Sequence, residues 1–159
     1  PSVEVSRRVG IPISVAGSFN GSSRSSITVF RPSNGEWYVH QATGDVGVLW
    51  GSGTDIPVPG DYDGDGKIDP AVFRASVGTW YILYSSTGYT TSQGFAWGLS
   101  TDVPVPSDFD GDGLCDPAVY RPSNGGWYVL RSSTGYTSSF GLSWGVSTDV
   151  PMNKRPWPQ

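Results

Sequence analysis

Two short acidic segments carry most of the chemistry that this sequence offers. Residues 61–69 read DYDGDGKID and residues 108–116 read DFDGDGLCD, so each has aspartate at positions 1, 3, 5 and 9. Like charges at this density repel one another strongly unless a cation lies among them. Carboxylate oxygens at alternate positions, with Gly at positions 4 and 6 to fold the chain back, suit a hard cation of the Ca²⁺ type.

The expected ligands are the four carboxylates and the main-chain carbonyl at position 7 of each segment, with water completing the shell. Mg²⁺ demands a tighter octahedron and keeps its own water, so Ca²⁺ is favoured, with two ions per chain. An EF-hand would need a bidentate Glu at position 12, where this sequence has Val72 and Val119. An acidic hairpin that binds no metal is the alternative interpretation. The predicted ligand residues are Asp61, Asp63, Asp65, Lys67 and Asp69, and then Asp108, Asp110, Asp112, Leu114 and Asp116.

The two acidic segments lie at the same place in a repeated unit. Residues 56–102 and 103–149 are two copies of equal length, and a shorter, degenerate copy covers residues 13–55. Residues 1–12, which include the alternating strand candidate VEVSRRV, form an N-terminal arm outside the copies. Residues 150–159 form a C-terminal tail, which begins a further unit and then leaves the pattern. Repeats of this length indicate an architecture in which neighbouring units stack on one another.

The first copy has lost the acidic positions. Its equivalent segment, residues 18–26, reads SFNGSSRSS, with Ser or Asn at every acidic place and Arg24 at position 7. A neutral loop can hold its turn by side-chain hydrogen bonds alone, so we expect no ion there. Asn20 also begins an Asn-Gly-Ser glycosylation sequon, for which an ordinary turn asparagine is the alternative.

Within a unit the apolar residues alternate with period two, which predicts short strands. In the second copy these are residues 56–62, 71–74, 79–84 and 92–97, and no stretch of the chain has the apolar spacing of a helix. Four strands in a unit of this size are typical of one β-propeller blade. The predicted fold is therefore all-β, with about three four-stranded antiparallel blades. Propellers close with four or more blades, so the incomplete ring is expected to be completed by oligomerisation or by a longer chain.

Composition supports this fold class and excludes others. The 21 aromatic residues among 159 supply enough apolar area for a core, which excludes a disordered chain. A single Cys excludes a disulfide framework, and scattered Lys and Arg give no nucleic-acid footprint. No run of apolar residues is long enough to insert in a membrane. Eight of the 14 acidic residues lie in the two acidic segments, so the formal charge of −4 reflects those segments.

The motifs DYDGDGKIDPAVFR and DFDGDGLCDPAVYR, each followed by a Trp-Tyr strand, resemble the FG-GAP/VCBS-type repeats of calcium-binding β-propellers. The resemblance covers the second and third copies fully and the first in degenerate form. It implies an extracellular or cell-surface protein with Ca²⁺ in the loop between the first two strands of a blade. By matching positions it assigns the ligand role to the eight aspartates named above. The neutral first loop and the small number of copies depart from the family pattern.

We therefore expect a secreted or cell-surface, calcium-stabilised structural or adhesive module that is not an enzyme. It is expected to assemble with copies of itself into a ring or filament, and to bind a glycan or cell-surface ligand. His40 is the only histidine and has no evident catalytic partner, and Cys115 replaces an apolar residue of the second copy. The rival interpretations are a carbohydrate-binding lectin, with exposed Trp or Tyr stacking on sugars, and a non-catalytic binding domain of a secreted enzyme.

Overall fold

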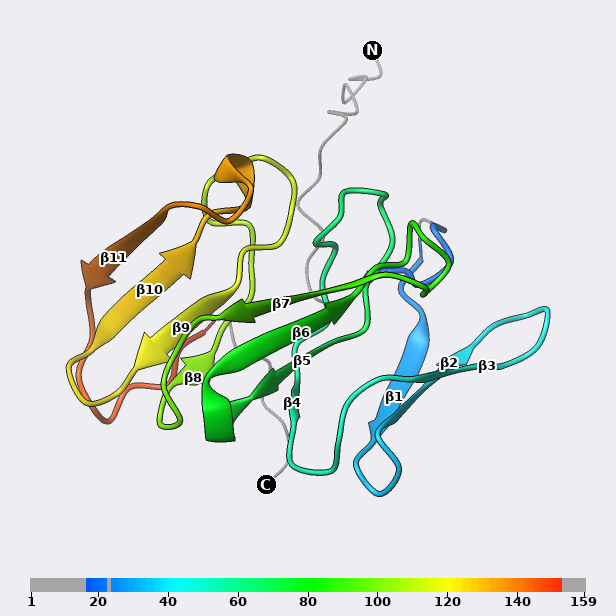
Figure 1. Ribbon diagram of the computed structural model, residues 1–159, viewed down its shortest axis with the longest axis horizontal. Helices are drawn as coiled ribbons and strands as arrows, with labels where there is room; N and C mark the ends of the chain where they lie inside the picture. Colours follow the sequence, from blue (N-terminus) through cyan, green and yellow to red (C-terminus); the bar gives the residue numbers. More distant parts are fainter. Residues whose placement is uncertain (1–16, 23, 153–159) are drawn as a thin grey trace, which may run out of the picture.

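The computed structural model describes residues 17–22 and 24–152, which form three antiparallel β-sheets (Figure 1). The first sheet contains β1 (Ile27–Arg31), β2 (Glu36–His40) and β3 (Val46–Leu49). The second contains β4 (Ile56–Pro57), β5 (Ala71–Arg74), β6 (Thr79–Leu83) and β7 (Ser92–Ala96). The third contains β8 (Val103–Pro104), β9 (Ala118–Arg121), β10 (Gly126–Leu130) and β11 (Ser139–Ser143). The described residues also contain two single 3₁₀ turns: η1 (Ala75–Val77) lies between β5 and β6, and η2 (Ser132–Thr134) lies between β10 and β11.

The described residues contain no α-helix, which confirms the all-β prediction. Strands β4 to β7 follow the four predicted segments, but β4 is much shorter than its segment because Pro57 and Pro59 have no N–H to donate. Pairing still continues beyond β4, since Val58 N donates to Ala71 O at 2.8 Å. Among the described residues the first sheet has three strands, whereas a blade of four was predicted. Residues 13–16 of the predicted unit, the N-terminal arm and most of the tail lie outside the described residues.

In each sheet an aromatic residue faces a tryptophan across a hairpin. The aromatic residue is the second-to-last residue of β1, β5 or β9, and the tryptophan lies on the next strand. In antiparallel strands such directly opposed side chains share one face of the sheet. The ring centroids lie 5.3, 5.5 and 5.3 Å apart in the three sheets. The pairs are Phe30 with Trp37, Phe73 with Trp80 and Tyr120 with Trp127.

The tyrosine that follows each tryptophan lies on the opposite face, as the alternation of a strand requires. There it is covered by an arginine, whose guanidinium carbon is 4.1 to 4.7 Å from the centre of the ring. Trp80 is fully buried, whereas Tyr81 is only partly buried. The pairs are Arg31 with Tyr38, Arg74 with Tyr81 and Arg121 with Tyr128.

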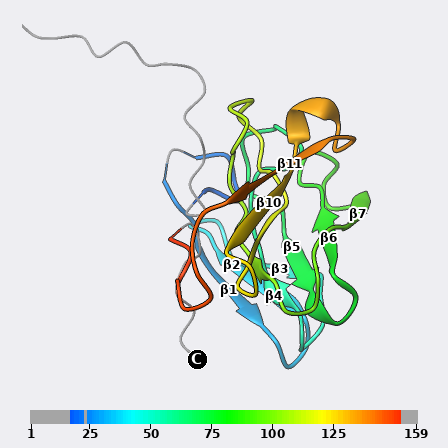
Figure 2. The ribbon, with the colours of Figure 1, turned by 90° about the vertical axis from the view of Figure 1, so that its left-hand side faces the viewer.

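The sheets lie side by side in chain order, and the core lies between neighbours (Figure 1). Seen from the side of β10 and β11, the other two sheets stand behind the third (Figure 2). One cluster joins Trp37 of the first sheet to Val72 of the second, and another joins Trp80 of the second to Val119 of the third. Each sheet therefore buries its apolar face against the next, while the described residues do not close into a barrel.

Where the chain passes from one sheet to the next, a charged pair ties the connecting segment to the sheet that follows. At the first junction the Arg74 guanidinium donates from Nε and a terminal nitrogen to the two carboxylate oxygens of Asp55, both at 2.8 Å. Arg121 and Asp102 form the same pair at the second junction, again at 2.8 Å. Burial acts to raise the pKa of Asp55, but the hydrogen bonds from Arg74 and Ser52 outweigh it and hold that pKa below its usual value.

Gly78, just before β6, lies against Gly98, just after β7, and substitution of Gly78 tests how closely the two segments approach. Gly78 has φ 61°, and a Cβ built there would lie 2.3 Å from the carbonyl oxygen of Gly98, whereas Gly88 has φ 64° and open space around it. A left-handed conformation costs a non-glycine residue about 1–2 kcal/mol. We expect Gly88→Ala to lower the free energy of unfolding by that amount. Gly78→Ala should lower it further, because the added methyl group would also clash with the carbonyl oxygen of Gly98. Urea denaturation of both variants measures the difference, and equal losses would contradict the close approach.

Candidate metal centres

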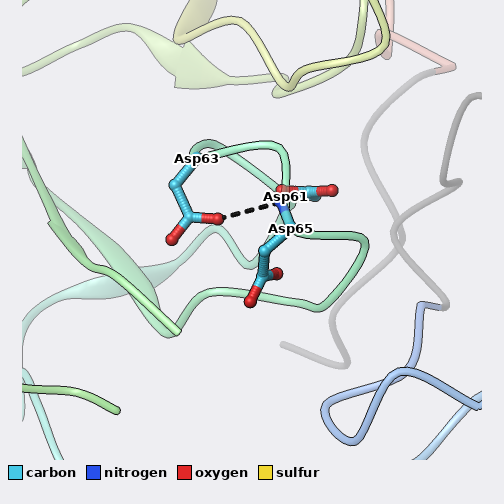
Figure 3. Close-up of side chains that lie close together, drawn as sticks. All are labelled: Asp61, Asp63 and Asp65. Atoms are coloured by element: carbon cyan, nitrogen blue, oxygen red, sulfur yellow. Dashed lines mark hydrogen bonds between the residues drawn. The ribbon is translucent and has the colours of Figure 1, made fainter. Parts of the chain in front are cut away.

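The first acidic segment forms the loop between β4 and β5. Asp61, Asp63 and Asp65 each offer a carboxylate oxygen there, and these three oxygens lie within 4.8 Å of one another. Figure 3 shows the three side chains gathered on one tight loop, with the Asp63 carboxylate joined to the backbone of Asp65. Such a cluster of oxygens from one short loop could hold a metal ion.

Hydrogen bonds from the loop's own backbone shape this cluster. Asp61 accepts from the N–H groups of Gly64 and Gly66 at 2.7 and 2.9 Å, one on each carboxylate oxygen. Both glycines have φ near +80°, a conformation that other residues rarely adopt, which lets the chain turn around Asp61. Asp63 and Asp65 each accept the N–H two residues further on, at 3.2 and 2.8 Å. These are Asx turns, and they fix the carboxylates at alternate positions.

The second acidic segment, between β8 and β9, is built in the same way. Asp108 accepts from Gly111 N and Gly113 N at 2.6 and 3.0 Å. Here the oxygens that lie within 4.8 Å of one another belong to Asp108, Asp110 and Asp116. Both clusters contain the carboxylates at positions 1 and 3. The third carboxylate comes from position 5 in the first loop and from position 9 in the second.

Position 7 distinguishes the two loops. Lys67 Nζ lies 3.2 Å from Asp65 Oδ2, whereas the second loop has the apolar Leu114 at this position. Asp65 Oδ2 is a buried atom that accepts no hydrogen bond among the described residues, so only this ion pair satisfies it there. The main-chain N–H groups of Lys67 and Leu114 bond to the aspartates two residues before them, and the ligand role of their carbonyls stays a prediction.

Position 9 anchors each loop to the rest of its sheet. Asp69 and Asp116 are both fully buried. Asp69 accepts from Tyr62 N at 2.8 Å and from Ser85 N at 2.7 Å, one on each carboxylate oxygen. Asp116 makes the equivalent bonds to Phe109 N and Ser132 N. These aspartates hold the loop against the turn that follows β6 or β10, a role that the spacing of the motif did not reveal.

Burial makes the negative charge of these carboxylates costly. It raises the pKa of Asp69 to about 7 even though amide hydrogen bonds from Ser85 and Tyr62 act in the other direction. Burial also raises the pKa of Asp61, and the neighbouring charges of Asp63 and Asp65 add to the effect. The pKa of Asp116 is raised by burial in the same way. A cation bound among these groups would favour their charged forms, so the electrostatics of the loops fit a metal site.

The sequence Ser-Ser-Thr-Gly, at residues 85–88 and again at 132–135, contributes a second set of contacts to the acidic loops. Ser85 Oγ donates to Asp65 at 3.0 Å and Ser86 N donates to Asp63 at 3.1 Å. Ser132 and Ser133 make the equivalent bonds to Asp112 and Asp110. A signal was present, because this tetrapeptide follows both acidic segments, whereas the neutral first copy has Gln-Ala-Thr-Gly at residues 41–44.

The neutral segment keeps the turn of the acidic ones without their charges. Ser22 N donates to Asn20 Oδ1 at 3.0 Å, as Asp65 N does to Asp63, and Phe19 N donates to Ser26 Oγ at 3.0 Å, as Tyr62 N does to Asp69. Hydroxyl and amide groups therefore replace carboxylates as acceptors. Asn20 is exposed on this turn, and its glycosylation stays a prediction.

Neighbouring loops are joined by backbone hydrogen bonds. Ile68 N of the second unit donates to Ser18 O of the first at 2.9 Å, and Cys115 N of the third donates to Asp61 O of the second at 2.7 Å. All three loops therefore lie in a row along one end of the sheets. Cys115 is buried in this row, as expected of a core residue, and burial raises the pKa of its thiol.

His40 has a partner that the sequence did not suggest. Its Nδ1 lies 2.7 Å from Asp45 Oδ1, across the turn between β2 and β3, and both side chains are mostly exposed. The tight hairpin brings these two residues together, and the prediction that His40 has no catalytic role stays a prediction. The described residues also include no helix with the length and apolarity needed to span a bilayer.

Comparison of the chain with protein-family models, with curated proteins and with solved structures found no match. The assignment of function therefore depends on the geometry of the acidic loops and of the sheets that carry them.

Proposed function

We propose that this protein is a calcium-stabilised structural or adhesive module of the β-propeller type, acting outside the cell or at its surface. The observation that carries the proposal is the convergence of three carboxylates within 4.8 Å on each of two loops. The backbone N–H groups of Gly64 and Gly66 hold the Asp61 carboxylate at the centre of the first loop and so fix the shape of this cluster. The resemblance to FG-GAP/VCBS-type repeats agrees with both the ion and the location.

The propeller part of the proposal rests on how the sheets stack. Each sheet is a small antiparallel unit that covers the apolar face of its neighbour, as a blade does, and the same Arg–Asp pair recurs at both junctions. The acidic loops join the first two strands of the second and third sheets, β4 to β5 and β8 to β9. This is where the resemblance places Ca²⁺ in a blade.

In this proposal the ion ties together parts of a sheet that are distant in sequence. The carboxylates of the loop already bond to the turn after β6 through Ser85 and Ser86. An ion held by Asp61, Asp63 and Asp65 would neutralise their repulsion and keep the loop in contact with that turn. Ca²⁺ therefore acts as a structural cross-link, and the function of the module lies in the surfaces that the cross-linked sheets present.

Titration calorimetry of protein stripped of metal by a chelator tests the ion directly. We expect two Ca²⁺ ions per chain, and about one after either Asp63→Asn or Asp110→Asn, because each change removes one carboxylate from one cluster. Asn20→Ser alters the equivalent position of the neutral loop and should leave the number of ions unchanged. A folded protein that takes up no Ca²⁺ at millimolar concentration would exclude the proposed function.

A further inference from the structure

We infer that copies of this chain associate head to tail, with the outer face of the third sheet of one copy packed on the outer face of the first sheet of the next. The inference rests on the proposed function, because it treats the sheets as stacked units of one module. It adds the partner, a second copy, and the residues that make the contact. The argument starts from the two junctions already present inside the chain.

At each internal junction an aspartate of the connecting segment, just before the first strand of the following sheet, meets an arginine of that sheet. Asp55 meets Arg74 at the first junction and Asp102 meets Arg121 at the second, with both hydrogen bonds of each pair at 2.8 Å. The equivalent residues at the two ends of the stack are Asp149 and Arg31. Both are exposed, and neither has an oppositely charged partner among the described residues.

The two unpaired groups already have the conformation of their paired equivalents. Asp149 Oδ2 accepts from Val146 N at 2.9 Å, just as Asp55 and Asp102 accept the N–H three residues before them at the same distance. The guanidinium of Arg31 lies 4.1 Å from the centre of the Tyr38 ring, as Arg74 and Arg121 lie over their tyrosines. Little conformational freedom is left to lose when the two meet, which favours association.

A valine on the following side fills the apolar centre of each junction. Val72 and Val119 are 1% and 0% exposed, and each has a methyl group 3.1 Å from where a Cβ on Gly51 or Gly98 would lie. The equivalent Val29 on the first sheet is 54% exposed. At the other end of the stack, the position equivalent to Gly51 and Gly98 has no valine beside it among the described residues.

A hollow marks that end. It has a volume of about 300 Å³ and is lined by Tyr120, Trp127, Trp144 and Asp149 together with Val150 to Met152. Trp144 is 74% exposed, whereas the equivalent Trp50 and Trp97 donate their indole N–H to Tyr81 O and Tyr128 O of the following sheet at 3.1 and 3.2 Å. By the same register, Trp144 of one copy would donate to Tyr38 O of the next, and Val29 would enter the hollow.

The first and third sheets thus carry the two complementary halves of one junction, including its opposite charges. A sugar could stack on Trp144 in the hollow, but it would leave Arg31 and Val29 without a partner at the other end. A second copy satisfies both ends at once, so the observations favour it. Because the contact joins two different surfaces, it repeats from copy to copy and gives a closed ring or an open filament.

Analytical ultracentrifugation of the full chain in Ca²⁺, from micromolar to submillimolar concentration, tests the inference. We expect the average mass to rise with concentration. Arg31→Glu and Asp149→Arg should each weaken association by about tenfold or more, because each places like charges at the junction. An equimolar mixture of the two variants should associate again, since every junction between unlike copies then joins opposite charges. Val29→Glu, at an exposed strand position, should also weaken association.

Two controls keep the outcomes separate. The variants should melt at the temperature of the original protein at high dilution, because positions 29, 31 and 149 are exposed there. Calorimetry on the same samples should still find two Ca²⁺ ions, so a monomer that binds calcium would overturn the association alone and leave the proposed function standing. A wild-type monomer at every concentration, with or without a bound sugar, would overturn the inference. So would an oligomer that is insensitive to changes at positions 31 and 149.

Discussion

Removing calcium with an excess of chelator is expected to lower the melting temperature of this protein by about 10 °C or more. A ligand that binds only the folded state, at 100 times its dissociation constant, stabilises that state by about 2.7 kcal/mol, so two such sites contribute about 5 kcal/mol. For a chain of this size each kcal/mol moves the melting temperature by about 2–4 °C. Relief of the repulsion between carboxylates in a poorly solvated loop is one source of this free energy.

Circular dichroism or calorimetry in calcium and in chelator gives this shift directly. The double variant Asp63→Asn with Asp110→Asn is the matched control, because it should melt at nearly the same temperature in both buffers. Restoring calcium after chelation should restore the original melt, which separates loss of the ion from irreversible damage. If the original protein melts identically in both buffers, the acidic loops do not act as stabilising calcium sites.

Trp80→Ala is expected to lower the free energy of unfolding by about 3–5 kcal/mol, the usual cost of removing a large buried aromatic side chain. Trp80 is 0% exposed, its ring contacts Phe73, and its indole N–H donates to Trp97 O at 2.8 Å. The change therefore removes both packing and a hydrogen bond from the core between the second and third sheets.

Trp144→Ala is the control for this substitution. Trp144 is 74% exposed, so truncating it should change the free energy of unfolding by no more than about 0.5 kcal/mol. Both variants should be unfolded in urea at a protein concentration low enough to keep copies apart. Equal losses for the two variants would mean that the core does not lie where the sheets are placed in Figure 1.

The strands and the local shape of the loops could be predicted from the sequence because both depend on neighbouring residues. Alternation with period two predicts β5 to β7 to within a residue at each end, and the glycines at positions 4 and 6 predict the turn around Asp61. The burial of Trp37 and Trp80, but not of Tyr38 and Tyr81, follows from the same alternation, whereas Trp127 and Tyr128 are both only partly buried. These features need no knowledge of what lies across the sheet.

Features that depend on contacts between distant segments could not be predicted in this way. Asp69 has the spacing of a ligand, yet its two oxygens accept the N–H groups of Tyr62 and Ser85, and only the packed turn after β6 brings Ser85 close. The joining of the loops through Ile68 and Cys115 depends likewise on how the sheets stack. Motif spacing gives candidate oxygens, whereas the tertiary structure decides which of them remain available to an ion.

The segment at residues 18–26, which carries no carboxylate, has a consequence for how order spreads through the molecule. Its turn closes with its own hydroxyl and amide groups, so the amino-terminal hairpins form whatever the supply of divalent ions. The second loop then has a ready-made neighbour, Ser18 O, to bond through Ile68, and the third has Asp61 O in turn. Scarcity of calcium should therefore loosen the chain from its carboxyl-terminal end, and the ion concentration sets how far the ordered part extends.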